Sequence, residues 1–257
     1  MKNKAKKIGV AAVIPAAMLL ATLSSSPPPA RHVPLSPPAV GASRTGEGGE
    51  ESPATPCPTT LSACPPEGCR GDPALNQLKN RLDIPTDGDV EPWSLTAVIS
   101  LNEDSPVGWS RKNSREPLKE LGEGTPVSLR GWLINAKPSA LETCNCKVKG
   151  VENKDFHLNL VSRQDDPLKE SVVVEMSPRT RHEGWKLTTL QAAVDEQRYV
   201  RVTGWLMFDS MHANFESAGM PRATAWEVHP VTKFEVCTKT KKDCDKGTGW
   251  ELLEELQ

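Results

Sequence analysis

The first third of the sequence has no aromatic residue. All 12 aromatic side chains lie at or after Trp93, whereas 13 of the 23 prolines lie between Pro15 and Pro73. A proline-rich segment without rings cannot bury enough apolar surface to offset the entropy lost on ordering the chain. The sequence therefore excludes two domains of equal size and predicts one packed domain in the remaining two thirds.

Neither sign of charge is in excess, and the familiar catalytic motifs are missing. The chain has 31 Lys and Arg against 33 Asp and Glu, a formal net charge of −2, so net charge does not favour a nucleic-acid partner. The sequence contains no nucleophile elbow, no phosphate-binding glycine loop and no His-Glu-x-x-His helix. No reaction can be named from these residues, and we expect a binding protein rather than an enzyme.

The amino terminus has the pattern of a secretory signal peptide. Four lysines precede an apolar run over residues 8–23, which is shorter than the 20 or so residues of a spanning helix. We predict a signal peptide over residues 1–26, with an uncleaved anchor as the alternative and the only contact with a membrane. Residues 27–71 are predicted to be a disordered proline-rich linker. The protein is then exported, either periplasmic or secreted.

The seven cysteines suit an exported protein with disulfides. A Pro-Pro-Glu-Gly turn predicts a disulfide between Cys64 and Cys69, and a short loop predicts another between Cys237 and Cys244. Cys57 is then the expected unpaired cysteine. The remaining two, Cys144 and Cys146, are two residues apart, so in a strand their side chains point the same way. This spacing suits two thiolates on one metal, with two separate disulfides or free thiols as the alternative.

Five segments have the alternation or β-branched content of strands, and one has a helical apolar face. The strands are expected at residues 127–135, 156–161, 171–176, 199–208 and 223–236, and the helix at 185–195. The order β-β-β-α-β-β is that of the OB-fold, a five-stranded Greek-key barrel. We therefore predict a mainly β protein with an OB-like barrel over residues 121–238. An unrelated antiparallel barrel or sandwich is the alternative.

The first and fourth predicted strands share the pattern V-x-[LV]-x-G-W-L. It occurs at residues 127–133 and 200–206. A glycine inside a strand marks a bulge or a close approach of two backbones. Gly131 and Gly204 are therefore expected where the barrel bends and closes.

The flanks of the barrel are expected to contain short helices. Residues 72–120 form a helical or irregular preamble. Within it, Asp72 and Pro73 begin a helix with leucines at 75, 78 and 82, and residues 94–100 suit a strand or a helix. Residues 239–257 form a charged tail with a helix over 250–256.

Residues 131–236, about two fifths of the chain, resemble a group of uncharacterised bacterial exported OB-like proteins. The resemblance implies a fold and a compartment, with no activity to carry over. It depends on four motifs: Glu142-Thr-Cys-Asn-Cys146, Asp155-x-His157, Gly204-Trp-Leu-Met-Phe-Asp209 and Arg222-Ala-Thr-Ala-Trp-Glu-Val-His-Pro-Val-Thr232.

The candidate site follows from where OB-folds bind ligands. That place is the face of the second and third strands, framed by the loops between strands 1 and 2 and strands 4 and 5. Here these loops span residues 137–155 and 209–221, and we expect them at one rim. The candidate metal ligands are Cys144, Cys146 and His212, joined by His157 or His229. Thiolates and imidazoles favour zinc; the alternative is a loop of solvated polar residues.

Two carboxylate–histidine pairs, Asp155/His157 and Glu227/His229, are expected as separate surface salt bridges, since the second and fifth OB strands are not neighbours. Phe156, Trp226 and Trp132 are assigned to the core, which argues against nucleic acid as a partner. The leading prediction is an exported binding or interaction module whose partner is a cell-envelope protein or glycan. The alternatives are a metal-dependent hydrolase at the loop rim and a binder of single-stranded nucleic acid or oligosaccharide.

Overall fold

A computed structural model of the chain describes residues 56–106, 109 and 112–256. The predicted signal peptide and most of the predicted linker lie outside these residues. In the part of the chain that is described, no helix is long and apolar enough to cross a membrane.

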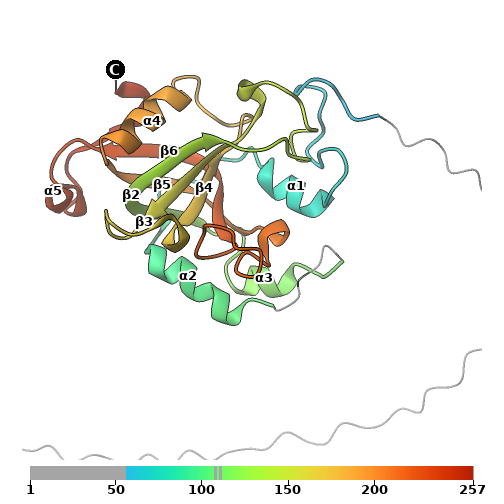
Figure 1. The fold of residues 1–257 in the computed structure, drawn as a ribbon, viewed down its shortest axis with the longest axis horizontal. Helices are drawn as coiled ribbons and strands as arrows, with labels where there is room; N and C mark the ends of the chain where they lie inside the picture. Colours follow the sequence, from blue (N-terminus) through green and yellow to red (C-terminus); the bar gives the residue numbers. More distant parts are fainter. Residues whose placement is uncertain (1–55, 107–108, 110–111, 257) are drawn as a thin grey trace, which may run out of the picture. The chain divides into compact units, whose positions relative to one another are not determined.

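Five strands form a closed barrel (Figure 1). Their spatial order is β2-β3-β4-β6-β5, and β5 pairs with β2 to close it. The β4–β6 pairing is parallel and the other barrel pairings are antiparallel. With helix α4 (Leu187–Asp195) between β4 and β5, this is the OB-fold arrangement, as the sequence predicts. The barrel strands are β2 (Pro126–Pro138), β3 (Phe156–Val161), β4 (Val172–Met176), β5 (Tyr199–Phe208) and β6 (Trp226–Cys237).

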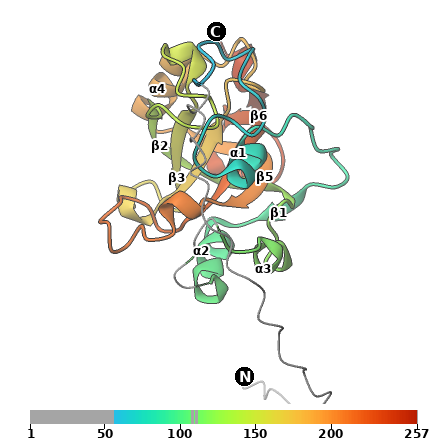
Figure 2. The same ribbon diagram turned by 90° about the vertical axis from the view of Figure 1, so that its right-hand side faces the viewer.

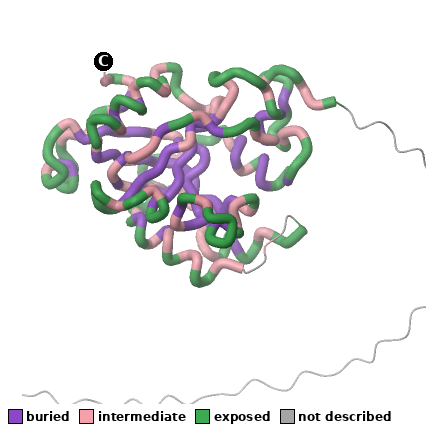
Figure 3. The backbone as a smooth tube through the Cα atoms, in the orientation of Figure 1, coloured by how far each residue is buried: buried purple, intermediate pink, exposed green. Residues whose placement is uncertain are grey.

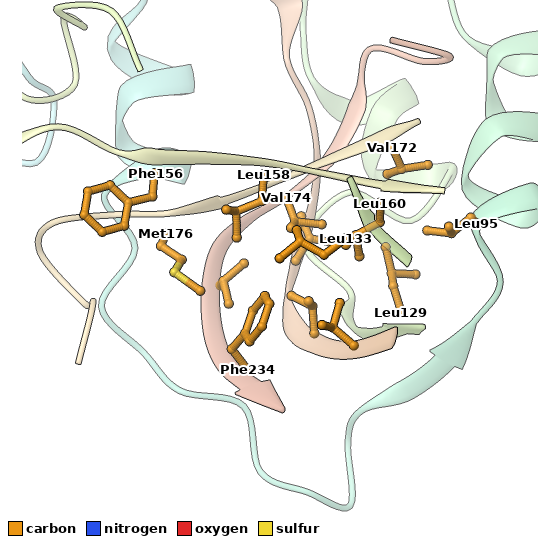
Figure 4. Close-up of a cluster of buried hydrophobic side chains, with 14 of the residues drawn as sticks. Leu95, Leu129, Leu133, Phe156, Leu158, Leu160, Val172, Val174, Met176 and Phe234 are labelled. Carbon is orange, nitrogen blue, oxygen red and sulfur yellow. The ribbon is translucent and has the colours of Figure 1, made fainter. Parts of the chain in front are cut away.

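The core lies inside the barrel, where the tube drawing shows the buried strands (Figure 3). Alternate residues of each strand point inward, among them Leu158, Val174 and Phe234, which are fully buried (Figure 4). Each such aliphatic side chain contributes about 1.5–3 kcal/mol when buried. Trp132 does not belong to this core: it stacks on Tyr199, with ring centroids 5.2 Å apart, in a second cluster. The expectation for Trp132 is wrong because its position in β2 points outward, one residue from the inward Leu133.

Short elements extend the barrel. Strand β1 (Glu91–Trp93) pairs in parallel with β2, and β7 (Trp250–Leu252) pairs with β6. Figures 1 and 2 show α2 and α4 on opposite sides of the barrel. The further helices are α1 (Pro73–Lys79), α2 (Leu95–Asp104), α3 (Glu116–Glu120) and α5 (Lys241–Asp245), with short 3-10 turns at Val151–Asn153, Leu168–Glu170, Ser210–His212 and Leu253–Glu255.

In three flanking segments the structure corrects or completes the secondary structure predicted from the sequence. Helix α1 has the predicted Asp72 cap, which accepts hydrogen bonds from the next backbone amides, but it ends at Lys79, and Leu82 is 65% exposed. Residues 94–100 belong to helix α2, which Ser94 caps. The predicted helix over 250–256 is wrong: this segment forms β7 and a 3-10 turn, because the free edge of β6 pairs with it.

Three disulfides link six of the seven cysteines, which indicates an oxidising compartment. Cys237–Cys244 confirms its prediction. The Cys64–Cys69 prediction is wrong: Cys69 pairs with Cys57, and Cys64 pairs with Cys146. Cys144 is therefore the unpaired cysteine, and it is buried. The local turn suggested the wrong pair because the β2–β3 loop brings Cys146 to Cys64 across 82 residues of sequence.

Both glycines of the repeated strand motif lie at close approaches. At Gly204 the ladder between β5 and β6 shifts register. A Cβ atom on Gly204 would lie 2.4 Å from the Pro230 carbonyl oxygen, and one on Gly131 would lie 2.9 Å from the Val161 carbonyl oxygen. The barrel closes at these two positions because no side chain separates the backbones.

We expect Gly204→Ala to lower the free energy of unfolding by about 2–3 kcal/mol, since the methyl group overlaps backbone that cannot move aside. The control is Gly88→Ala, where nothing lies within 4 Å of the added carbon. Urea unfolding measures both. Equal stability of the two variants would contradict the role assigned to Gly204.

Peptide mapping without reduction is expected to recover the three disulfide pairs and one thiol, Cys144. Because Cys144 is buried, iodoacetamide should label it at once in urea but only slowly in the folded protein. Fast labelling of the native protein, or a Cys64–Cys69 peptide, would contradict the arrangement.

Candidate functional site

A row of three side chains crosses the outer face of three adjacent strands. His157 lies on β3, Glu175 on β4 and His229 on β6. Core residues alternate with them along each strand, so all three point away from the barrel interior. The Glu175 carboxylate lies 3.0 Å from Nδ1 of His157 and 3.0 Å from Nδ1 of His229. This carboxylate joins the two histidines into one site.

The two carboxylate–histidine pairs are therefore not separate surface salt bridges. His229 and Glu227 are no more than 1% exposed. Nε2 of His229 lies 3.9 Å from Oδ1 of Asp155, so the two pairs meet. The expectation is wrong because β4 lies between the second and fifth OB strands and supplies the connecting residue. Glu175 was not among the predicted site residues because it lies near the end of an apolar run. The signal that could have identified it is a single carboxylate within an otherwise apolar strand.

Five carboxylates lie around this row. Together with the basic side chains that they contact, they are called the charged cluster. Four of them, Asp155, Glu175, Asp209 and Glu227, are buried, and Glu142 is partly buried. Two basic side chains form ion pairs with them. Nζ of Lys79 lies 3.0 Å from Glu142 and 3.1 Å from Asp209, with Glu175 and Glu227 each at 3.8 Å. Arg222 lies 2.7 Å from Glu227.

Lys79 reaches the cluster because the chain before the barrel is fastened to the β2–β3 loop. Helix α1 packs against β6. The amide of Asn80 donates to the carbonyls of Pro66 and Cys144, each at 2.8 Å. The Cys64–Cys146 disulfide holds the same two segments together. Figure 2 shows α1 lying across the strands as part of this cover.

The β5–β6 loop adds a further histidine–carboxylate contact. Asp209 directly follows β5 and caps the turn Ser210–His212 by accepting from the Met211 amide. Its other oxygen lies 2.8 Å from Nδ1 of His212. The turn therefore places His212 beside the cluster, half-buried, with a buried carboxylate behind it.

A pocket of about 530 Å³ opens above the cluster. Both predicted rim loops line it, which confirms that they lie at one rim. Its inner wall carries Lys79, His157, Glu175, Asp209 and His212. Its exposed lining residues include the apolar Leu141 and Met211, which are 42% and 65% exposed, and the lysines Lys137 and Lys147. The pocket thus has apolar and basic side chains at its opening and a charged base.

The predicted metal ligands do not form one set. Cys146 is oxidised to a disulfide and has no thiolate to offer. The potential ligand atoms of the others fall into three neighbouring groups, each within 4.8 Å: Glu142 with Cys144 and Asp155, Asp155 with Glu175 and His229, and Asp209 with His212 and Glu227. His157 contacts Glu175 from outside these groups.

Burial and mutual attraction set the protonation of the cluster. Burial, with the charges of Glu142 and Glu175, raises the pKa of Asp155 to about 7. Burial opposes the charge on His229, but Glu175, Glu227 and Asp155 outweigh it and raise its pKa to about 10. Burial also opposes ionisation of Glu175 and Asp209, yet Lys79 and the histidines hold the pKa of each well below its usual range.

The same forces make Cys144 a poor nucleophile. Burial, followed by the charges of Asp155 and Glu142, raises the pKa of the Cys144 thiol well above its usual value. Its Sγ lies 3.6 Å from Glu142 and 3.8 Å from Asp155. Nucleophilic thiol chemistry needs the thiolate, so the cluster does not have the electrostatics of a cysteine hydrolase.

Comparison with protein-family models, with curated proteins and with solved structures finds no match.

The raised pKa of Asp155 predicts a pH-dependent stability. Between pH 4 and 7 the folded protein holds a proton on Asp155 that the unfolded chain has lost, so this contribution is present at low pH and is lost as pH rises to about 7. Asp155→Asn should remove this pH dependence. The gain in free energy of unfolding of the variant over the native protein should be larger at pH 7.5 than at pH 4.5, by on the order of 3 kcal/mol.

Urea unfolding in a chelator at both pH values measures this, with the exposed Asp165→Asn as the control. A pH dependence that is identical in the native protein and in Asp155→Asn would show that Asp155 is not a buried, protonated carboxyl.

Proposed function

We propose that the protein is an exported binding module that takes a small polar molecule into the pocket beside the outer face of β3 and β4. The observation that supports it best is the position of the pocket. It lies where the two rim loops of an OB barrel meet, over the outer face of β3 and β4, and its base is the charged cluster. OB-folds bind ligands on this face. Concave sites with a few converging polar groups are the usual small-molecule sites.

Export is supported by two independent features. The three disulfides persist in oxidising compartments, and the sequence begins with a basic segment followed by an apolar run. Periplasmic or secreted location, and the resemblance to exported OB-like proteins, are part of the proposal.

The covering of the barrel face favours a small ligand over a polymer. The outward positions of β3 and β4 include Asn159, Val173 and Glu175, and all three are buried under other segments. Phe156, the aromatic residue of these two strands, belongs to the core. Single-stranded nucleic acid needs stacking rings along an open groove. The pocket instead admits one compact molecule between Leu141 and Met211.

The polar base defines the chemistry of the ligand. Carboxylates, imidazoles and the Lys79 ammonium lie together there, so a ligand that both donates and accepts hydrogen bonds is matched. We expect a compact hydroxylated or zwitterionic molecule whose apolar part faces the mouth.

Ligand-observed NMR with a library of small polar fragments tests this proposal. We expect hits that compete with one another for the native protein and that lose binding at least tenfold in Met211→Trp and Leu141→Trp, since an indole at the mouth closes the pocket. Val151→Trp is the matched control, because Val151 is 49% exposed and lies away from the pocket lining. Fragments that bind all variants equally, or no competing hits, would refute the pocket as the binding site.

A further inference from the structure

The charged cluster contains an unusual set of unsatisfied atoms. Oδ1 of Asp155, Oε1 of Glu227 and Nε2 of His229 are buried without a hydrogen-bond partner among the described residues. These three residues are at most 1% exposed. A buried polar group without a partner costs about 1–3 kcal/mol, and more when charged. Three such atoms in one place point to a ligand.

Asp155 and Glu227 each have one oxygen satisfied and one left over, whereas Glu175 is held between two histidines. Oδ2 of Asp155 accepts from the Asn145 amide at 3.2 Å. Oε1 of Glu175 lies against His157 at 3.0 Å. Oε2 of Glu227 accepts from Arg222 at 2.7 Å. The partners orient the carboxylates, as outer-shell groups orient the ligands of metal ions.

Three carboxylate oxygens surround His229. Oε2 of Glu175 and Oε1 of Glu227 lie 3.0 and 3.7 Å from Nδ1, and Oδ1 of Asp155 lies 3.9 Å from Nε2. An ion takes only one of the two ring nitrogens, and one ligand atom from each of Asp155, Glu175 and His229 lies within 4.8 Å of the other two. Ligand atoms about 2.0–2.2 Å from a tetrahedral ion are about 3.3–3.6 Å from each other, so side-chain rotations that draw these three atoms together would form a ligand set.

The charge of the cluster favours a cation at this point. Five carboxylates face three basic side chains, Lys79, Arg222 and His229. Lys79 lies nearest Glu142 and Asp209 and 3.8 Å from Glu175 and Glu227, and Arg222 is held by Glu227. Burying anions is costly unless cations or protons compensate them. Asp155 is the buried carboxylate farthest from Lys79 and Arg222 in this set of ion pairs, so a further positive charge beside it is the most favourable.

We propose that Asp155, Glu175 and His229 bind a divalent transition-metal ion, with Glu227 beside it. Two carboxylates and one imidazole suit zinc and its neighbours. Three protein ligands leave a position for another molecule, as in zinc sites that act on a ligand. The inference rests on the proposed function in one respect: Glu175 also lines the pocket, so the ion would be the polar anchor for the bound molecule.

The site differs from the set expected from the sequence. Of the predicted ligands it keeps His229. It omits Cys146, which is in a disulfide. It also omits His157, which supports Glu175, and His212, which contacts Asp209. Cys144 lies near Asp155 but contacts its other oxygen.

Zinc binding to the full mature chain, with disulfides intact and chelator removed, tests the proposal. We expect one zinc per chain by elemental analysis and calorimetry. Glu175→Gln and His229→Gln should each weaken binding by about 100-fold or more, because outer-shell changes alone cost 10–100-fold. Two matched controls should bind normally: Glu235→Gln, a buried carboxylate of β6 paired with Arg201, and His182→Gln, an exposed histidine.

Two further measurements keep the test decisive if a ligand variant fails to fold. Lys79→Gln removes a cation beside the site and should tighten zinc binding by at least threefold, since like charges no longer repel. Cobalt in place of zinc should show ligand-field bands without thiolate charge transfer, whereas a strong thiolate band would assign Cys144 as a ligand and overturn this set.

Three outcomes would overturn the proposal. One is the absence of stoichiometric zinc, with NMR showing His229 protonated at both nitrogens, because the imidazolium would then be the cation that the oxygens surround. Another is loss of binding in His212→Gln but not in His229→Gln, which would place the ion at Asp209. A third is unchanged affinity in Lys79→Gln. Fragment binding is measured both with zinc and in chelator: binding that is closed off by Met211→Trp but unchanged by zinc supports the pocket without the metal site, so the two failures are distinguishable.

Discussion

The compensation of buried negative charge governs the outer face of this barrel. Four carboxylates from two strands and the ends of two loops lie in one place with almost no exposure to solvent. Such a group is stable only if cations are delivered to it. Lys79 does this from a helix of the chain that precedes the barrel, and Arg222 does it from the β5–β6 loop. The amino-terminal cover is thus required by the charges beneath it, and the Cys64–Cys146 disulfide fastens it there.

This cover changes the surface that an OB barrel usually presents. The face of the second and third strands is usually an open groove, but here α1, the β2–β3 loop and the β5–β6 loop lie over it. A pocket lined by Leu141 and Met211 opens beside this cover, with charged groups at its base. On the function proposed above, a compact molecule rather than a polymer would enter it. The charged residues that stabilise the cover are also the groups that a ligand would meet.

Local patterns predicted the barrel well because each of its elements is determined by neighbours in sequence. Strands β3 and β5 have the predicted bounds, since alternation with a buried face is visible over six to ten residues. The Asp72 cap and the bulge at Gly204 were visible for the same reason. The prediction for segment 250–256 was wrong because its conformation depends on pairing with the edge of β6. That edge, at Glu235–Cys237, is not a close neighbour in sequence. The pairing of Cys64 with Cys146 likewise depends on a loop 82 residues away.

The sequence by itself determined the OB order of strands and helix, the glycines at the closure points, the two loops of the rim and the residue types available there. Only the tertiary structure decided which of those residues form the site. Glu175 joins His157 to His229 because β4 lies between β3 and β6, and Lys79 enters because α1 packs against β6. The physical reason is that strand order is set by long-range pairing, whereas a sequence pattern reports only which face of a strand each residue occupies.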